Sequence, residues 1–201
     1  MKRIRWIPEV RVSSLLPGVA VLVLLAEGAD AADDSVKEKV SLCTSCHGER
    51  GVSQTENTPS LAGQPDLFLQ WQLVFFRSGS RKNEVMQPIA EQLRNEDIRN
   101  LGAYFASLPP AAATKPGESS QAESGAKIVA GRSCASCHTD TFAGTKETAR
   151  IAGQREDYLV KALHDYKSGA RSGSGVAATA SVAYSLSDDE ISALAHYLAH
   201  L

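Results

Sequence analysis

Apolar and polar positions alternate along this chain with the period of helices. Amphipathic helix patterns cover residues 34–46, 65–77 and 95–108, and again residues 124–137, 155–167 and 188–201. Ser187 and Glu190 have the spacing of a capping box, which predicts the start of the last of these helices. No convincing alternation of period two is found, so we predict an all-α protein.

The N-terminus carries a different hydrophobic pattern. Four basic side chains precede a continuous apolar run over residues 14–26, which is shorter than the roughly 20 residues that a bilayer span needs. Ala29 and Ala31 are small residues at the two positions that signal peptidase reads. We therefore predict a signal peptide over residues 1–31 rather than an uncleaved anchor, and expect a periplasmic bacterial protein without a membrane span after cleavage.

The rest of the chain is an internal duplication. Residues 61–81 align with 151–171 at an offset of 90, and eight of the 21 positions are identical. The final helix patterns match at an offset of 93, and a segment rich in Pro, Ala and Ser lies between the two copies. We predict two domains, residues 32–108 and 125–201, joined by a linker over residues 109–124.

Charge narrows the range of functions. The formal net charge is −2, and removal of residues 1–31, with four basic and three acidic side chains, changes it only to −3. A chain so close to neutral has no electrostatic footprint for nucleic acid. Each domain is also near the lower size limit for a stable core, where a disulfide, a metal or a large apolar cofactor is often needed.

All four cysteines lie in one repeated motif, CTSCH at residues 43–47 and CASCH at residues 134–138. A redox dithiol belongs with a βαβ pattern that is missing here, and a four-thiolate zinc site leaves both adjacent histidines unexplained. A disulfide within Cys-x-x-Cys is strained. Two thioether bonds to haem vinyl groups need this short spacing, and the histidine that follows becomes the proximal iron ligand. We therefore predict two covalently bound haem c groups.

Met86 is the only methionine besides the first residue. It lies in the segment expected to be a loop before the last helix of the first half, where a thioether can approach the iron from the side opposite His47. Such a soft ligand favours reduced iron and raises the reduction potential. The alternative is a methionine that fills a gap in the core.

The first half, with CTSCHGERG, TPSLAGQ, FRSGSR and MQPIAEQL in this order, resembles the class I cytochrome c fold, and the tandem is similar to dihaem cytochromes of the cytochrome c-four type. The resemblance covers essentially the whole mature chain. It implies that Pro59 occupies the proline position near the backbone acceptor for the second histidine nitrogen. It also implies a set of cofactor ligands: Cys43, Cys46, Cys134 and Cys137 for the haem thioethers, and His47, Met86 and His138 for iron.

The second half departs from this pattern around its haem. Thr179 stands opposite Met86, Thr139 opposite Gly48, and Ala149 opposite Pro59, and the second domain has no methionine. We expect a five-coordinate or water-bound second iron with a lower reduction potential than a methionine-ligated one. Weaker alternatives for a sixth ligand stay open, namely His164, His196, His200, Tyr184 and Thr179. Arg81 and Arg171 face either haem propionates or solvent.

The resemblance implies an electron carrier that performs no bond-making chemistry and docks redox proteins, such as a dehydrogenase or a terminal oxidase, at an exposed haem edge. Two other functions remain. In the first, the chain would be a haem subunit of a larger periplasmic dehydrogenase. In the second, it would be a sensor that binds ligands at an open second iron. Peroxidase-like chemistry at that iron stays open, although residues 175–185 offer no histidine or arginine for it.

Overall fold

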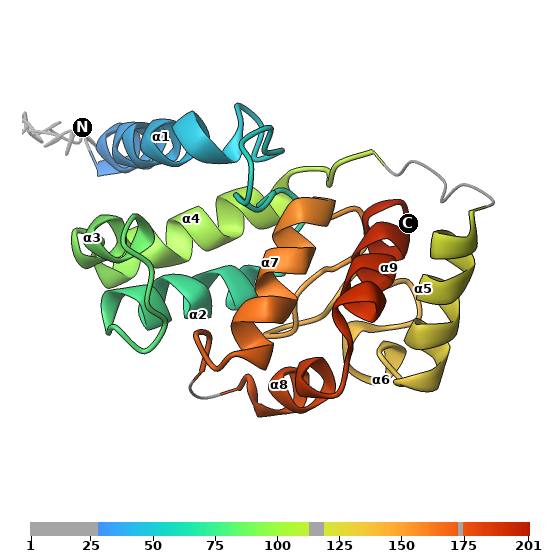
Figure 1. The fold of residues 1–201 in the computed structure, drawn as a ribbon. Helices are drawn as coiled ribbons and strands as arrows, with labels where there is room; N and C mark the ends of the chain where they lie inside the picture. Colours follow the sequence, from blue (N-terminus) through green and yellow to red (C-terminus); the bar gives the residue numbers. More distant parts are fainter. Residues whose placement is uncertain (1–27, 113–118, 173–174) are drawn as a thin grey trace, which may run out of the picture.

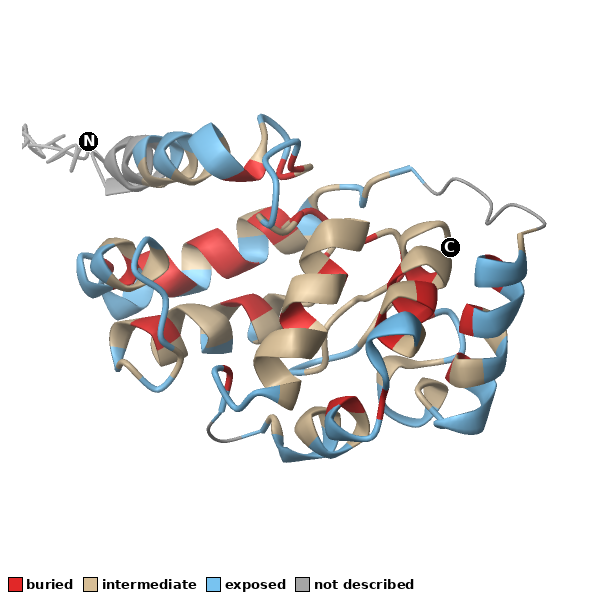
Figure 2. Cartoon of the chain, viewed as in Figure 1, coloured by how far each residue is buried: buried red, intermediate tan, exposed pale blue. Residues whose placement is uncertain are grey.

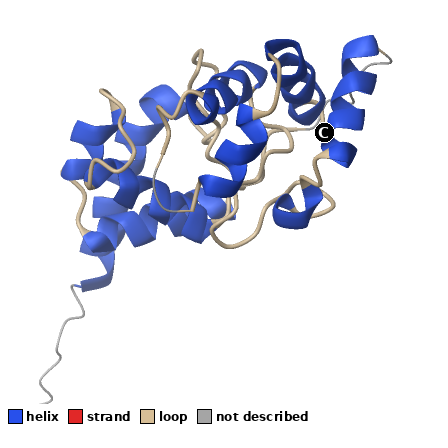
Figure 3. Ribbon diagram, turned by 60° about the horizontal axis from the view of Figure 1, so that its bottom comes forward, coloured by secondary structure: helices blue, strands red, loops and turns tan. Residues whose placement is uncertain are grey.

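The structure, a computed structural model, describes residues 28–112, 119–172 and 175–201, with the backbone alone over residues 28–35. The described part is helical (Figure 3), and its only pairing of the β type is a bridge between Thr145 and Thr148. The all-α class is therefore confirmed. The elements are α1 (Gly28–His47), α2 (Asp66–Arg77), α3 (Met86–Glu91), α4 (Asn95–Ser107), α5 (Ser120–Gly131), α6 (Ala135–His138), α7 (Glu156–Lys167), α8 (Ala177–Tyr184) and α9 (Asp188–Ala199).

The helices pack around two hydrophobic clusters, one in each half of the chain. In the first half, α2 packs against α3 and α4, and α1 packs against α4. In the second half, α9 packs against α5 and α7, and α7 also packs against α8. Figure 1 shows α1–α4 on one side of the molecule and α5–α9 on the other. The buried members of the first cluster are Leu69, Leu93, Ile98, Leu101 and Phe105, and those of the second include Val129, Phe142, Leu159, Leu186, Ile191, Leu194 and Leu198.

The last helix of each half supplies much of its core (Figure 2), because one face of α4 and one face of α9 are buried along their lengths. At Gly125 the backbone of α5 comes so close to α9 that an added Cβ would lie 2.3 Å from the carbonyl oxygen of Ala193. The capping box expected at Ser187 is confirmed, since Glu190 N–H bonds the hydroxyl and Ser187 N–H bonds the carboxylate.

Two segments expected as loops contain short helices instead. Met86 is the first residue of α3, because Asn83 Oδ1 accepts hydrogen bonds from the backbone N–H groups of Val85 and Met86 at 3.1 and 2.8 Å. In the second half α8 occupies the corresponding place. Both helices have only one or two turns, which is too short for a helical period to be recognised in the sequence.

The helix that leads into the second cysteine motif also differs from the expectation. α5 begins at Ser120, inside the segment 109–124 expected as a linker, because the Ser119 hydroxyl accepts a hydrogen bond from Ala122 N–H at 3.1 Å and caps the helix. The expected single helix over residues 124–137 is interrupted between α5 and α6, where Ser133 has a positive φ of 53°. Residues 113–118 of the expected linker lie outside the described residues.

The two halves meet through a reciprocal pair of glutamines, Gln64 and Gln154, which occupy equivalent positions in the duplication. Gln64 donates to Arg150 O at 2.8 Å and accepts from Arg150 N–H at 3.0 Å. Gln154 donates to Ser60 O at 2.9 Å and accepts from Ser60 N–H at 2.8 Å. Since Ser60 and Arg150 are also equivalent, the interface repeats each contact with the halves exchanged, as in a two-fold dimer.

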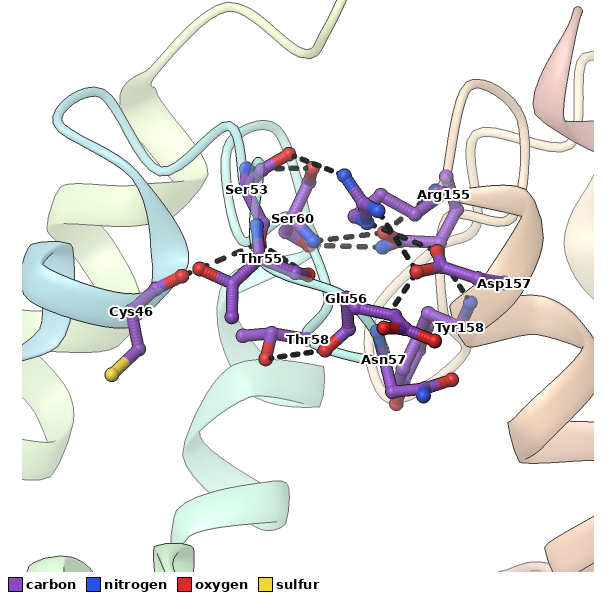
Figure 4. Close-up of polar contacts among 11 residues, drawn as sticks. Cys46, Ser53, Thr55, Glu56, Asn57, Thr58, Ser60, Arg155, Asp157 and Tyr158 are labelled. Carbon is purple, nitrogen blue, oxygen red and sulfur yellow. Dashed lines mark hydrogen bonds and ion pairs between the residues drawn. The ribbon is translucent and has the colours of Figure 1, made fainter.

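The same interface is extended by the loop that follows the first cysteine motif (Figure 4). Asp157 accepts a hydrogen bond from Asn57 N–H at 2.8 Å, and Arg155 donates to Ser53 O at 3.2 Å. Arg155 and Asp157 also pair with each other at 2.8 Å. These contacts attach the beginning of α7 to the first half of the chain.

Of the predicted signal peptide, residues 1–27 lie outside the described part, and residues 28–31 form the beginning of α1. Among the described residues, no helix combines the length and the apolar character that a membrane crossing requires.

Candidate functional site

Both cysteine motifs line one cavity of about 840 Å³ between the two halves. Residues 43–47 end α1, whereas residues 134–138 run from the turn after α5 through α6. No disulfide joins the four cysteines. Aliphatic and aromatic side chains from both cores complete the wall, among them Leu69, Phe76, Leu101, Phe105, Leu159, Leu194 and Leu198.

The two motif histidines are held in the same way. His47 Nδ1 lies 2.8 Å from the carbonyl oxygen of Pro59, and His138 Nδ1 lies 2.8 Å from that of Ala149. Because a carbonyl only accepts, each Nδ1 carries the proton and each Nε2 keeps a free lone pair. Burial lowers the pKa of both imidazoles and so favours the neutral form that binds metals. The replacement of Pro59 by Ala149 in the second half therefore leaves the backbone acceptor in place.

The thiols do not have the character of a redox pair. Burial raises the pKa of Cys43 to about 11 and also raises that of Cys134, whereas reactive Cys-x-x-Cys thiols have lowered values. Nor do the motifs form a thiolate metal centre: the one group of three close metal-ligand side chains in the described part is Glu156, His196 and His200. The structure thus gives no support to a redox dithiol or to a four-thiolate zinc site, the two alternatives considered from the sequence.

Met86 and Thr179 both line the cavity, on α3 and α8 respectively. Met86 and Thr179, which stand opposite each other in the two halves of the sequence, therefore reach the same cavity. Met86 is thus available to a group beside His47. On the α8 side, the cavity is lined by Ala178, Thr179 and Val182, of which only Thr179 has a polar side chain.

The other side chains considered for the second iron lie elsewhere. His164, His196, His200 and Tyr184 are outside the cavity lining. His164 lies 4.0 Å from Asp188, and His196 lies 3.1 Å from Glu156. Tyr184 is 77% exposed. The lining of the cavity in the second half therefore offers one histidine, His138.

Two arginines from equivalent positions converge on the cavity wall. Arg81 donates to Gln72 Oε1 and to the Tyr158 hydroxyl at 2.6 and 3.2 Å, and Arg171 donates to the same Gln72 oxygen at 2.9 Å. The Nε of Arg171 is buried without a hydrogen-bond partner. Burial would raise the pKa of Tyr158, but the charges of Arg81 and Arg171 outweigh it and lower the value to about 8.

These features fit haem. The cavity has apolar walls for a porphyrin, two imidazoles with free Nε2 atoms for iron, and paired thiols beside each imidazole. Two guanidinium groups, bonded here to neutral acceptors, match the carboxylates that haem carries. From the sequence, Arg81 and Arg171 were expected to face either haem propionates or solvent. Arg171 is buried, which excludes the solvent alternative for that residue.

Sequence reasoning missed the polar residues that join the halves. Gln64, Gln154, Gln72 and Tyr158 were not singled out, although the repeated AGQ at residues 62–64 and 152–154 is a visible signal. An identical glutamine in both copies indicates a shared role, but only the fold reveals that each one bonds the backbone of the other half.

Known proteins resemble this chain over most of its length. The family model of cytochrome c matches residues 122–201. A cytochrome c4 of Pseudomonas aeruginosa is 31% identical over 196 residues, which cover 92% of this chain and 98% of the relative. A thiosulfate dehydrogenase electron acceptor of Stutzerimonas stutzeri is 31% identical over 218 residues, covering 100% and 97%. The crystal structure of reduced recombinant cytochrome c4 from Pseudomonas stutzeri has a TM-score of 0.76 at 29% identity, covering 84% of this chain and 97% of that one.

The likeness extends over both halves of the duplication and over nearly the full length of these relatives. It agrees with the two cysteine motifs and with the helical fold around one shared cavity. The chain belongs to the cytochrome c4 family and is a dihaem electron-transfer protein with covalently bound haem c.

Proposed function

We propose that the two haems are attached at Cys43 and Cys46 and at Cys134 and Cys137, with His47 and His138 as proximal ligands and Met86 as the distal ligand of the first iron. Haems held by these residues would supply one-electron redox chemistry, with which the chain could take an electron from one protein partner and deliver it to another. The observation that carries the proposal is the single cavity lined by both motifs. One cavity lined by both motifs would bring the two haems into the same apolar enclosure between the halves.

The protein's contribution is to position the haems and to tune their potentials. Pro59 O and Ala149 O orient the imidazoles through the Nδ1 hydrogen bonds. Arg81 and Arg171 would hold the carboxylates of the haems, and their positive charge would oppose oxidation of the iron and so raise the reduction potentials. With these roles for its side chains, the protein acts as an electron carrier.

The second haem has a further candidate function, which is the binding of a small ligand. Thr179 faces the cavity where the first half has Met86, and the histidines outside the motif are directed to other partners. A threonine hydroxyl is a poor iron ligand compared with a thioether. A haem held at His138 would therefore have no thioether from α8 beside it, and its iron could take up water or a small diatomic ligand.

The partners are redox proteins in the bacterial periplasm, which the chain reaches through the signal over residues 1–31. The Stutzerimonas stutzeri relative is named an electron acceptor of thiosulfate dehydrogenase. Delivery to a terminal oxidase and acceptance from such a dehydrogenase are compatible with the same carrier. A haem subunit bound permanently to a dehydrogenase is the alternative, and co-purification of the native protein distinguishes the two.

Intact mass spectrometry of the exported protein tests haem attachment. The mass should equal that of residues 32–201 plus two haem groups, and Cys134→Ala/Cys137→Ala should leave one. A redox titration should then resolve two one-electron steps, of which Cys134→Ala/Cys137→Ala removes one. A mass equal to polypeptide plus zinc, or a single haem, contradicts the proposal.

A further inference from the structure

A second group of metal-ligand side chains lies outside the haem cavity. Glu156 is the first residue of α7, and His196 and His200 lie four residues apart at the end of α9. One ligand atom from each of the three falls within 4.8 Å of the others. We propose that Glu156, His196 and His200 bind a divalent late first-row transition metal ion, with zinc as the physiological candidate.

The orientation of His200 is already that of a metal ligand. Its Nδ1 donates a hydrogen bond to the carbonyl oxygen of His196 at 2.7 Å. This bond fixes the tautomer, so that the lone pair is on Nε2. Histidines that bind metals usually donate their other nitrogen to a carbonyl or carboxylate in this way. The two imidazole rings lie with their centroids 4.5 Å apart, so both can face one ion.

Glu156 completes the set from another helix. Its Oε2 lies 3.1 Å from His196 Nδ1. Tetrahedral zinc with bonds of about 2.0–2.1 Å holds neighbouring ligand atoms roughly 3.3 Å apart, so this pair needs little movement to share an ion. In the metal-free protein a proton lies between the two atoms, and the ion replaces it as it binds.

The donor types select the metal. Two imidazoles and one carboxylate suit zinc, copper and nickel, whereas calcium and magnesium prefer sets made of oxygen atoms alone. The site is open to solvent on one side, since the side chains of Glu156 and His196 are 42% and 22% exposed. Three protein ligands leave a fourth position for water.

A bound ion would connect the beginning of α7 to the end of α9. Glu156 lies between Arg155 and Asp157, which bond Ser53 O and Asn57 N–H of the first half. The ion therefore braces the segment that holds the two halves together, and stabilisation of the folded protein is the expected consequence.

The test uses the haem-loaded protein, freed of metals with a chelator and titrated with zinc sulfate by calorimetry in competition with a weaker chelator. We expect one zinc per chain and a rise of the unfolding temperature on zinc addition. His200→Ala and Glu156→Gln should each weaken binding by more than about 10-fold, because loss of even an outer-shell partner costs 10–100-fold. His164→Ala is the matched control, since it removes a histidine of the same half that lies outside the cluster.

Glu156→Gln keeps the shape of the side chain, and an unchanged haem absorption spectrum verifies that each variant is folded. A crystal soaked with zinc should give an anomalous peak between Glu156 and His196. Absence of stoichiometric binding, or equal binding by His200→Ala and His164→Ala, overturns the proposal. Neither result affects the assignment of the haem ligands, which the mass and redox measurements test separately.

Discussion

His138 Nδ1 lies 2.8 Å from the carbonyl oxygen of Ala149, and this contact repeats the one between His47 and Pro59 in the first half. The acceptor is a backbone atom in both halves. The proline ring therefore restricts the backbone but is not needed to provide the acceptor. The histidine keeps its orientation in the half that lacks the proline.

Pro59→Ala should consequently leave the first haem nearly unchanged. We expect the reduction potential and the absorption spectrum to be retained, because the carbonyl that orients His47 is still present. The free energy of unfolding should fall by only about 0.4–1 kcal/mol, since alanine makes the unfolded chain more flexible. Spectroelectrochemistry and denaturant titration measure the two quantities, and a loss of the His47 ligand would contradict the interpretation.

The residue after each motif histidine has unusual backbone geometry, and here the halves differ. Thr139 has φ 69° and ψ 163°, a conformation that is favourable for glycine and strained for other residues. Thr139→Gly should therefore stabilise the second half by about 1–2 kcal/mol. Thermal unfolding of the haem-loaded protein measures this gain, and an unchanged or lower stability would contradict it.

The reverse change at the equivalent position of the first half, glycine to a residue with a side chain, should lower the stability. Gly48 has φ 87°, and an added Cβ would lie 2.0 Å from the carbonyl oxygen of Val52. Gly48→Ala should lower the free energy of unfolding by at least about 2 kcal/mol, because both the conformation and the space exclude a side chain. Comparison of Thr139→Gly with Gly48→Ala tests whether stability depends on the local backbone conformation. If glycine were unfavourable in general, Thr139→Gly would lower the stability and Gly48→Ala would raise it.

The reciprocal glutamine contacts between the two halves give a further prediction. Gln154→Ala removes two buried hydrogen bonds and leaves the N–H and C=O of Ser60 without partners. The free energy of unfolding should fall by about 2–4 kcal/mol, and Gln64→Ala should have a similar effect on the Arg150 side. Gln87→Ala is a control, because its amide bonds only Glu91 on the same helix. Equal stability of Gln154→Ala and the control in urea titration would refute the role.

Much of the fold was visible in the sequence because the helices are amphipathic and the duplication repeats them. The helix from Glu156 and the capping box at Ser187 follow from local patterns alone. The start of α5 and the short helix at Met86 were not predicted, since each depends on one capping side chain, Ser119 or Asn83.

The candidate site also has a part that the sequence predicts and a part that it does not. The motif Cys-x-x-Cys-His carries its chemistry in consecutive residues, so the sequence suffices to predict it. The convergence of Arg81 and Arg171 on Gln72 arises only when the two halves meet, 90 residues apart along the chain. The sequence pattern of one half alone therefore cannot predict such a contact.

That convergence predicts how charge tunes the haems. Arg171→Gln removes a buried positive charge from the cavity wall, which makes the oxidised state less unfavourable. At least one reduction potential should fall by roughly 40 mV, which corresponds to ~1 kcal/mol for two unit charges about 17 Å apart in an effective dielectric near 20. Arg99→Gln, an exposed change on α4, should leave both potentials in place. Potentiometric titration of the three proteins decides between these outcomes, and equal potentials would remove Arg171 from the haem environment.

Thr179 gives the prediction that tests the difference between the two haems. With no thioether in the second half, the second iron should be largely high-spin, and the reduced protein should bind one carbon monoxide per two haems. Thr179→Met places a thioether on the α8 wall of the same cavity. This variant should shift the second iron toward low spin, lower its carbon monoxide binding and raise its potential, because sulfur ligation favours reduced iron. Met86→Ala is the reciprocal change: it should open the first iron, abolish the far-red sulfur-to-iron band and raise the stoichiometry to two carbon monoxide molecules. Two low-spin irons in the electron paramagnetic resonance spectrum of the unmodified protein would instead mean that another group completes the second site.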